Sequence, residues 1–215
     1  MIKTRHKWMW VWLLCAIAVL STGTACHSKP SGPGMILSFG SVIESKRVYI
    51  KSSKMSNGQP FSNPGSVGGV GTSKWGSWRH IPTKVEAASG DGRGLPDWVE
   101  FVWQELDYPG LQPASFPSNE AYSKHIREEF SSVPIKTQRL EIKSRVPQDV
   151  VDEVIESKRN APRGEVAEKS LWVFIFWTPD GIRMRWQLRD DPGRKQRNFG
   201  DVVREGGDDL DRYNR

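Results

Sequence analysis

Cysteine and histidine are scarce in this chain of 215 residues, which has two cysteines and four histidines. Both cysteines, Cys15 and Cys26, lie near the amino terminus, so the sequence beyond them has neither a disulfide nor a reactive thiol. Small domains of oxidising compartments often rely on disulfides, and their absence means that this fold depends on its core alone. Nucleophilic catalysis by cysteine is excluded for the same reason.

Long hydrophobic runs are also missing, since the longest unbroken apolar run covers the 13 residues 8–20. As a helix this run rises about 20 Å, which is short of the ~30 Å hydrocarbon core of a bilayer. It follows a basic segment with Lys3, Arg5 and Lys7 and precedes the small, polar residues 21–25. This order is typical of a cleaved secretory signal peptide over residues 1–25.

Cys26 comes directly after these small residues, as in the signals of bacterial lipoproteins. We expect cleavage before Cys26 and a diacylglycerol on its thiol, which anchors the chain to a membrane; no other cofactor is predicted. His27 replaces the aspartate that signals inner-membrane retention in enteric-type bacteria, so we expect an outer-membrane lipoprotein that faces the periplasm. Two alternatives stay open because Gly23 replaces the usual leucine of the lipid box. An ordinary signal peptidase would release a soluble protein, and an uncleaved leader would act as an anchor.

A large charge excess is absent once the leader is removed. The leader carries three basic groups and no acid, so the formal charge falls from +6 to +3. A charge this small argues against nucleic acid as a partner. The remaining 190 residues suit one domain, and most of their seven tryptophans are expected in its core.

Side chains for catalysis are few. No serine lies in a G-x-S-x-G motif. His125 begins HIREE, which lacks the second histidine of an inverted zinc-protease motif, so we expect a surface or half-buried side chain. Glu100 and Glu105 flank a strand without further signs of a catalytic pair. No catalytic residue is therefore predicted.

Two other motifs are incomplete ligand sites. Asp208, Asp209 and Asp211 lack the glycine turn and distal glutamate of a calcium loop, which indicates a solvated tail. The glycine-rich residues 65–71 are not followed by Gly-Lys-Ser/Thr, which favours a flexible loop over a phosphate cradle. No metal site is predicted.

The sequence does contain a series of short apolar segments with a period of two. They predict an α+β, β-rich fold: an antiparallel sheet or sandwich with about two helices. A helix is expected over residues 119–130 with Ser118 as its cap, and another from Pro147 to about residue 159. Strands are expected over residues 35–43, 47–51, 98–105, 137–145, 170–178 and 182–188.

The last two of these strands flank Pro179-Asp180-Gly181 and predict a hairpin. Its first strand is apolar on both faces and therefore central. Its second has Arg183 and Arg185 on either side of Met184, so it is amphipathic or an edge. We assign residues 26–34 to the acylated cysteine and a flexible tether, 35–190 to a single β-rich domain, and 191–215 to a short final element and a charged, frayed tail.

One cluster indicates a binding function. Trp75, Trp78, Arg79 and His80 lie together in the segment KWGSWRH after the glycine-rich loop. Tryptophan and arginine often anchor protein interfaces, which makes the cluster a candidate partner-binding site. In the alternative arrangement, both tryptophans fold back and plug the end of the sheet.

Several features follow the lipoprotein signal in a fixed order. Paired strands and a glycine-rich stretch ending in WGS come first, and Leu95-Pro96, a strand ending in Val102-Trp103, a proline-entered helix and the Trp177 hairpin come next. Over residues 36–188 this order resembles a bacterial lipoprotein family filed as domain of unknown function 2931. The insert at residues 108–134 is longer and more polar than the resemblance implies. The family has no established catalytic residues. In their cellular setting, its members resemble certain periplasmic lipoproteins that act as immunity proteins. Those lipoproteins are encoded beside type VI secretion phospholipase effectors.

These observations favour a non-enzymatic lipoprotein that faces the periplasm and binds another protein. The most specific version is an immunity protein that neutralises a secreted phospholipase effector. The alternative is an envelope structural or glycan/lipid-binding lipoprotein that uses Trp75 and Trp78. A hydrolase is the third hypothesis.

Overall fold

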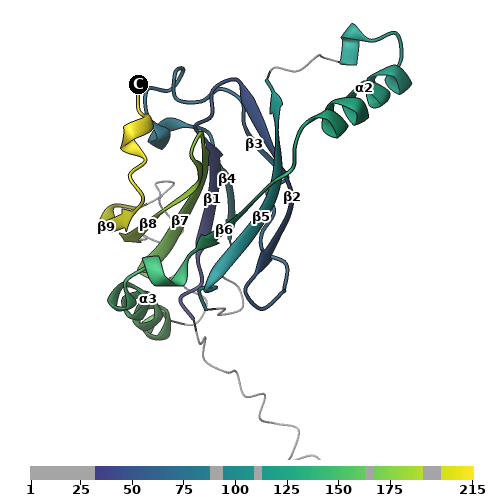
Figure 1. Cartoon of the computed structure of the whole chain (residues 1–215). Helices are drawn as coiled ribbons and strands as arrows, with labels where there is room; N and C mark the ends of the chain where they lie inside the picture. The colour runs from purple at the N-terminus through teal and green to yellow at the C-terminus, as the bar shows by residue number, and fades with distance from the viewer. Residues whose placement is uncertain (1–31, 88–93, 109–112, 163–166, 191–199) are drawn as a thin grey trace, which may run out of the picture.

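Two β-sheets packed face to face form most of the molecule, as Figure 1 shows. The computed structural model describes residues 32–87, 94–108, 113–162, 167–190 and 200–215, and the leader with Cys26 lies outside these ranges. Two α-helices, α2 and α3, accompany the sheets in the described part of the chain. The predicted α+β, β-rich class is confirmed.

The first sheet has five strands in the order β4-β1-β7-β8-β9. β7 (Lys169–Thr178) and β8 (Gly181–Asp190) form the predicted hairpin, and β7 is central, as its apolar sequence indicates. β1 (Ile36–Ser41) runs parallel to β7, a detail that the antiparallel prediction did not include. The edges are β9 (Val202–Gly207) and β4 (Lys84–Ala87), and the sequence pattern had not indicated β4.

The second sheet has four antiparallel strands in the order β3-β2-β5-β6. β2 (Lys46–Met55) and β5 (Trp98–Asp107) are longer than predicted and form its centre. β6 (Lys136–Glu141) is one edge. The other edge is β3 (Ser66–Gly68), which forms inside the stretch predicted to be only a loop.

The main core lies between the two sheets. Phe101 and Trp103 of β5 meet Trp177 of β7, with ring centroids 5.4 and 6.5 Å apart. The prediction that most tryptophans are core is confirmed for five side chains, namely Trp78, Trp103, Trp172, Trp177 and Trp186.

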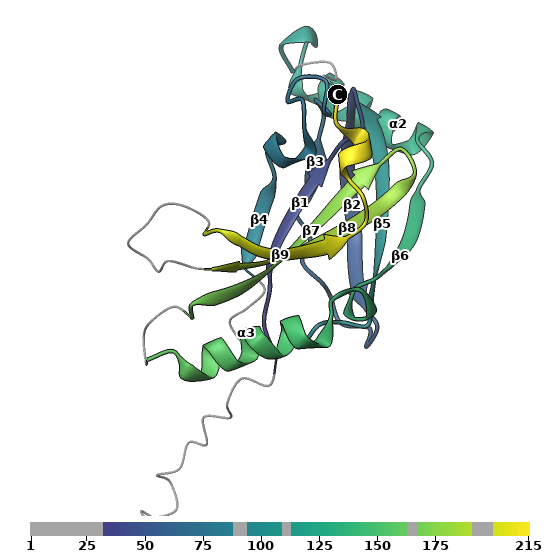
Figure 2. The same ribbon diagram turned by 90° about the vertical axis from the view of Figure 1, so that its left-hand side faces the viewer.

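α3 (Gln148–Asn160) covers one end of the sandwich (Figure 2). It buries Val150, Val151 and Val154, as its apolar spacing predicted. Pro147 takes the cap position just before the helix, where its missing N–H costs no hydrogen bond.

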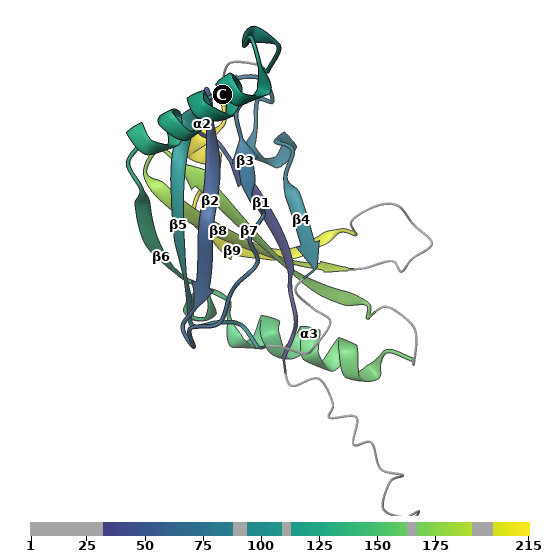
Figure 3. The same cartoon turned by 90° about the vertical axis from the view of Figure 1, so that its right-hand side faces the viewer.

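α2 (Asn119–Ser132) projects beyond the four-stranded sheet (Figures 1 and 3). Ser118 caps its first turn as predicted, and none of its residues is buried. The helix is held at its end, where the Gln104 side chain donates hydrogen bonds to the carbonyl oxygens of Phe130 and Val133. No helix in the described ranges is long and apolar enough to cross a membrane.

Two segments are more ordered than expected. Gly32, Pro33 and Gly34, which we assigned to the flexible tether, are buried. Residues 200–215, which we assigned to a short final element and a charged, frayed tail, include β9 and a 3-10 turn, and Leu210 is fully buried. The physical reason is that Leu210 completes a second apolar cluster on the outer face of the five-stranded sheet. Residues 191–199 of the predicted tail lie outside the described residues.

Candidate functional site

The candidate site starts from Trp78, which opens the short 3-10 helix Trp78–His80 (η1). Ser77 caps this turn by accepting a hydrogen bond from the Arg79 N–H at 3.3 Å. The Trp78 side chain is 2% exposed and packs edge-on against Phe174 and Phe176 of β7, with ring centroids 5.7 and 5.6 Å apart. The sequence left open whether Trp78 is an exposed anchor or folds back onto the sheet, and the structure has it buried.

The C-terminal segment holds Trp78 in this position. Asp211 Oδ1 accepts a hydrogen bond from the indole N–H at 2.8 Å, and Asn214 Oδ1 accepts one from the Trp78 backbone N–H at 3.0 Å. The indole bond is the largest cause that lowers the pKa of Asp211 below its ordinary value. Asp208 accepts from the Met184 N–H and pairs with Arg145 at 2.7 Å. The predicted solvated tail is therefore wrong for these acids, because they satisfy donors of the sheet and of η1.

The other three residues of the predicted cluster lie nearer the surface. Trp75 is half-buried beside the Lys74 ammonium, which lies 5.4 Å from the ring centroid. Arg79 and His80 are exposed. Arg79 turns toward the outer face of the five-stranded sheet, whereas a His80 ring nitrogen lies 3.3 Å from the Trp75 carbonyl oxygen. The cluster therefore divides between core and surface.

A row of arginines on β8 extends this surface. Side chains alternate along the strand, so Ile182, Met184, Trp186 and Leu188 are buried on one side, which confirms the amphipathic prediction; Gln187 on the other side is also buried. The opposite side carries Arg183, Arg185 and Arg189. With Arg79 they form what we call the arginine face.

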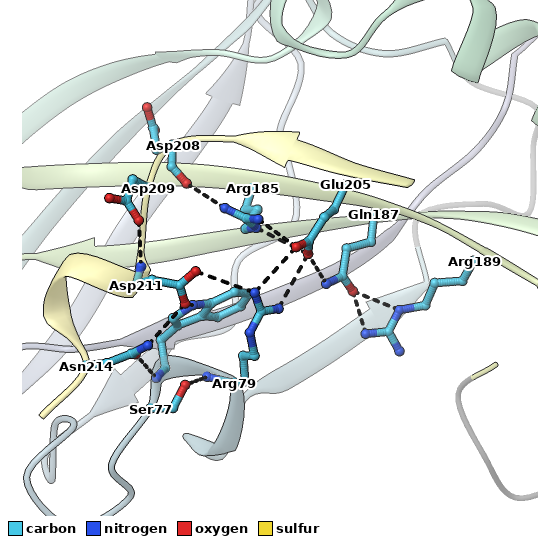
Figure 4. A network of polar contacts seen from close by, with 11 residues as sticks. Ser77, Arg79, Arg185, Gln187, Arg189, Glu205, Asp208, Asp209, Asp211 and Asn214 are labelled. Atoms are coloured by element: carbon cyan, nitrogen blue, oxygen red, sulfur yellow. Dashed lines mark hydrogen bonds and ion pairs between the residues drawn. The ribbon is translucent and has the colours of Figure 1, made fainter. Parts of the chain in front are cut away.

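Glu205 of β9 lies at the centre of the arginine face (Figure 4). Its carboxylate pairs with Arg185 at 2.7 Å and with Arg79 at 3.4 Å, and it accepts a hydrogen bond from Gln187 Nε2 at 2.9 Å. These donors, Arg185 above all, lower the pKa of Glu205 to about 2. Gln187 in turn accepts from Arg189 Nε at 2.9 Å, so one network joins both strands to η1.

Aromatic rings form the floor beneath the guanidinium groups. Arg79 lies 4.7 Å from the centroid of Trp78, and Arg189 lies 4.8 Å from that of Trp172. Trp172 in turn stacks on Phe174. A cation over an aromatic face contributes about 0.5–2 kcal/mol and restricts the rotation of the side chain. Arg79, Arg185 and Arg189 are therefore held in place before any partner arrives.

This arrangement suits recognition of a negative group. Guanidinium groups bind carboxylates and phosphates with two donors each, and they do not release protons near neutral pH. Glu205 also stays ionised, so neither group matches a general acid or base near pH 7. Within the ranges listed above, no three His, Cys, Asp or Glu side chains come together in a way that could hold a metal ion.

The remaining sequence candidates have structural contacts. Glu100 pairs with Lys54 at 2.7 Å, and Glu105 pairs with Lys136 at 2.8 Å. His125 is half-buried on α2, as expected, with its ring centroid 5.1 Å from that of Phe116.

The glycine-rich loop contacts Glu44, which accepts hydrogen bonds from the Ser73 N–H and hydroxyl at 2.8 and 2.7 Å. Glu44 also fills the space that a side chain at Gly71 would need. These contacts explain the glycine at position 71.

Sequence reasoning missed five members of this site, namely Arg183, Arg185, Gln187, Arg189 and Glu205. The alternation of β8 was a signal for the first four. No family model, curated protein or solved structure matches this chain, so its function is argued from the site itself.

Proposed function

We propose that the protein is a non-enzymatic lipoprotein of the bacterial envelope that binds another protein through its arginine face. Cys26 carries the lipid, and the domain faces the periplasm from the outer membrane. The observation that carries the proposal is the network around Glu205, which holds arginines of η1 and β8 over aromatic rings. Arginine and tryptophan are the residues most enriched at interface hot spots.

The guanidinium donors of this surface indicate an acidic partner. Glu205 pairs with Arg79 and Arg185, Asp211 pairs with Arg79, and Asp208 beside them pairs with Arg145. The backbone of Arg183 pairs with β7, whereas its partly buried guanidinium makes no hydrogen bond or ion pair with the part of the chain that the structure describes. Partner carboxylates that approach this face gain charge-assisted hydrogen bonds and faster association.

The most specific form of the proposal is an immunity protein that neutralises a lipid-degrading effector. A lipid anchor supports this role because it confines the inhibitor to the surface where the effector acts and so raises its effective concentration. The alternative, glycan or lipid recognition by Trp75 and Trp78, has less support because Trp78 is 2% exposed.

Co-expression tests the proposal. Where a neighbouring gene encodes a secreted lipase, that lipase is directed to the periplasm with and without this protein. We expect survival only when the protein is present. The variant Arg183→Glu should weaken binding by about tenfold or more, because one reversed charge at such an interface costs at least ~1.4 kcal/mol. Arg127→Glu is the matched control, because Arg127 is an exposed arginine on α2, away from the arginine face.

Two outcomes contradict the proposal. Survival without the protein removes the immunity function. If Arg127→Glu and Arg183→Glu weaken binding equally in a calorimetric titration with the purified lipase, the arginine face is not the interface.

A further inference from the structure

The chain enters the fold at the end that α3 covers. β1 begins with Ile36 opposite Trp172, near the start of β7. Lys169, the first residue of β7, is bound to α3. Its N–H donates to Ser157 Oγ at 2.9 Å, and its Nζ lies 3.5 Å from a Glu153 carboxylate oxygen. Figure 2 shows β1 rising from the same end of the sandwich as α3.

Little of the predicted tether is free to act as one. Gly32, Pro33 and Gly34 are buried, and Met35 is 4% exposed within the main core. Residues 26–31 therefore separate a lipid on Cys26 from the fold. Six residues reach at most about 20 Å even when fully extended.

We propose that the α3 end of the domain faces the bilayer at a distance of no more than about 20 Å, with α2 at the membrane-distal end. This inference rests on the proposed lipid anchor. The two ends are separated by the length of β7, whose ten residues span about 33 Å. α2 is bound at the far end of the sandwich through Gln104, near the end of β5. Asp107, the last residue of β5, pairs with Lys46, the first residue of β2.

The helix turned toward the membrane carries more acids than bases. α3 has four acids, Asp149, Asp152, Glu153 and Glu156, against Lys158 and Arg159, and a hollow of about 290 Å³ beside it is lined by Glu153, Glu156, Glu168 and Lys169. A helix with a net negative charge is not attracted to anionic lipid headgroups. The covalent tether, rather than headgroup binding, therefore sets the distance between α3 and the bilayer.

This orientation determines where the partner lies. The arginine face runs along β8 from Arg189, opposite Ser170 near the start of β7, to Arg183, opposite Phe176. It therefore extends about 20 Å away from the membrane-proximal end. A partner bound there lies beside the domain and within reach of the lipid surface, which suits an enzyme that acts on lipids.

The absence of other thiols makes a direct test possible. Single cysteines are introduced as Glu156→Cys on α3 and as Ser123→Cys on α2, both at exposed positions. The lipidated full-length variants are labelled with a fluorophore and reconstituted into vesicles of phosphatidylethanolamine and phosphatidylglycerol with an acceptor on the headgroups. We expect energy transfer to be at least about twofold stronger from position 156 than from position 123, because the ends lie ~33 Å apart.

Each outcome decides a separate claim. A Gly/Ser insertion after Ser31 lengthens the tether and should weaken energy transfer from position 156. High salt should leave this transfer unchanged. Equal transfer from both positions on vesicle-bound protein overturns the orientation while the lipid anchor stands. Protein that does not associate with vesicles, with an unmodified Cys26 by mass, overturns the lipid anchor itself.

Discussion

Trp78→Ala should destabilise the protein strongly. The side chain is 2% exposed, and it packs on Phe174 and Phe176 within the second apolar cluster. A tryptophan buries up to ~250 Å², which at about 25 cal/mol per Å² gives an upper limit near 6 kcal/mol. Partial collapse of the cavity reduces the expected loss to about 3–5 kcal/mol.

Urea unfolding followed by circular dichroism measures this loss, and the melting temperature should fall by about 10 °C or more. Trp75→Ala is the matched control, because Trp75 is only half-buried. It should lose about 1–2 kcal/mol.

Trp78→Phe separates packing from hydrogen bonding. This variant keeps an aromatic ring but removes the N–H that donates to Asp211. Its free energy of unfolding should therefore fall by about 1 kcal/mol beyond the loss from poorer packing. The pKa of Asp211 should rise toward its ordinary value, because this bond is the largest cause of its depression. A loss below ~1 kcal/mol in Trp78→Ala refutes the reasoning and restores Trp78 as an exposed anchor.

Three further predictions test the network, the sheet and α2. Glu205 has its pKa lowered to about 2, so its stabilisation is present above the ordinary carboxylate pKa near 4.5 and is lost as the pH falls toward 2. Glu205→Gln should lower the free energy of unfolding by about 1–2 kcal/mol at pH 7, because solvent screens this exposed carboxylate, and should flatten the pH dependence of stability over this interval; an unchanged curve contradicts the pairing. Gly40→Ala should cost about 1–3 kcal/mol in urea unfolding, because its new carbon would lie 2.5 Å from the buried Phe176 ring; a neutral effect means that the ring can move. Gln104→Ala should speed amide exchange in α2 but not in β7 or β8, since it removes the side chain that holds the end of the helix, and uniform acceleration argues against this local role.

Local signals were sufficient for the elements that the sequence predicted. Ser118 begins α2, Pro147 precedes α3, and Pro179-Asp180-Gly181 turns between β7 and β8, each through contacts within a few residues. Sequence periodicity also indicated which strand is central, because only β7 is apolar on both faces. The parallel pairing of β1 with β7 depends on residues far apart in the sequence, and no local pattern encodes it.

The edge strand β9 shows why the C-terminal segment was only partly predicted, as a short element followed by a frayed tail. Gly206 and Gly207 in a charged stretch are typical of a tail, but here a side chain at either position would clash with a neighbouring residue. A side chain at Gly206 would lie 2.7 Å from the Trp186 ring, and one at Gly207 would lie 2.5 Å from the Met184 carbonyl oxygen. Gly207 also has a φ of 101°, which favours glycine. These glycines permit the strand, and only the three-dimensional neighbours reveal it.

Only part of the candidate site could be predicted from the sequence, for the same reason. The alternation of β8 places Arg183, Arg185 and Arg189 on one side, but their order depends on Glu205, which lay in the segment assigned to the tail. Unpaired arginines on a strand lose rotamer freedom when a partner binds, at about 0.5–1.5 kcal/mol each. Glu205 and the aromatic floor fix Arg79 and Arg185 beforehand, so a partner carboxylate meets guanidinium groups that are already in place. By this argument, removing Glu205 should weaken partner binding even though it makes the surface more positive, and tighter binding by Glu205→Gln would show that net charge matters more than order.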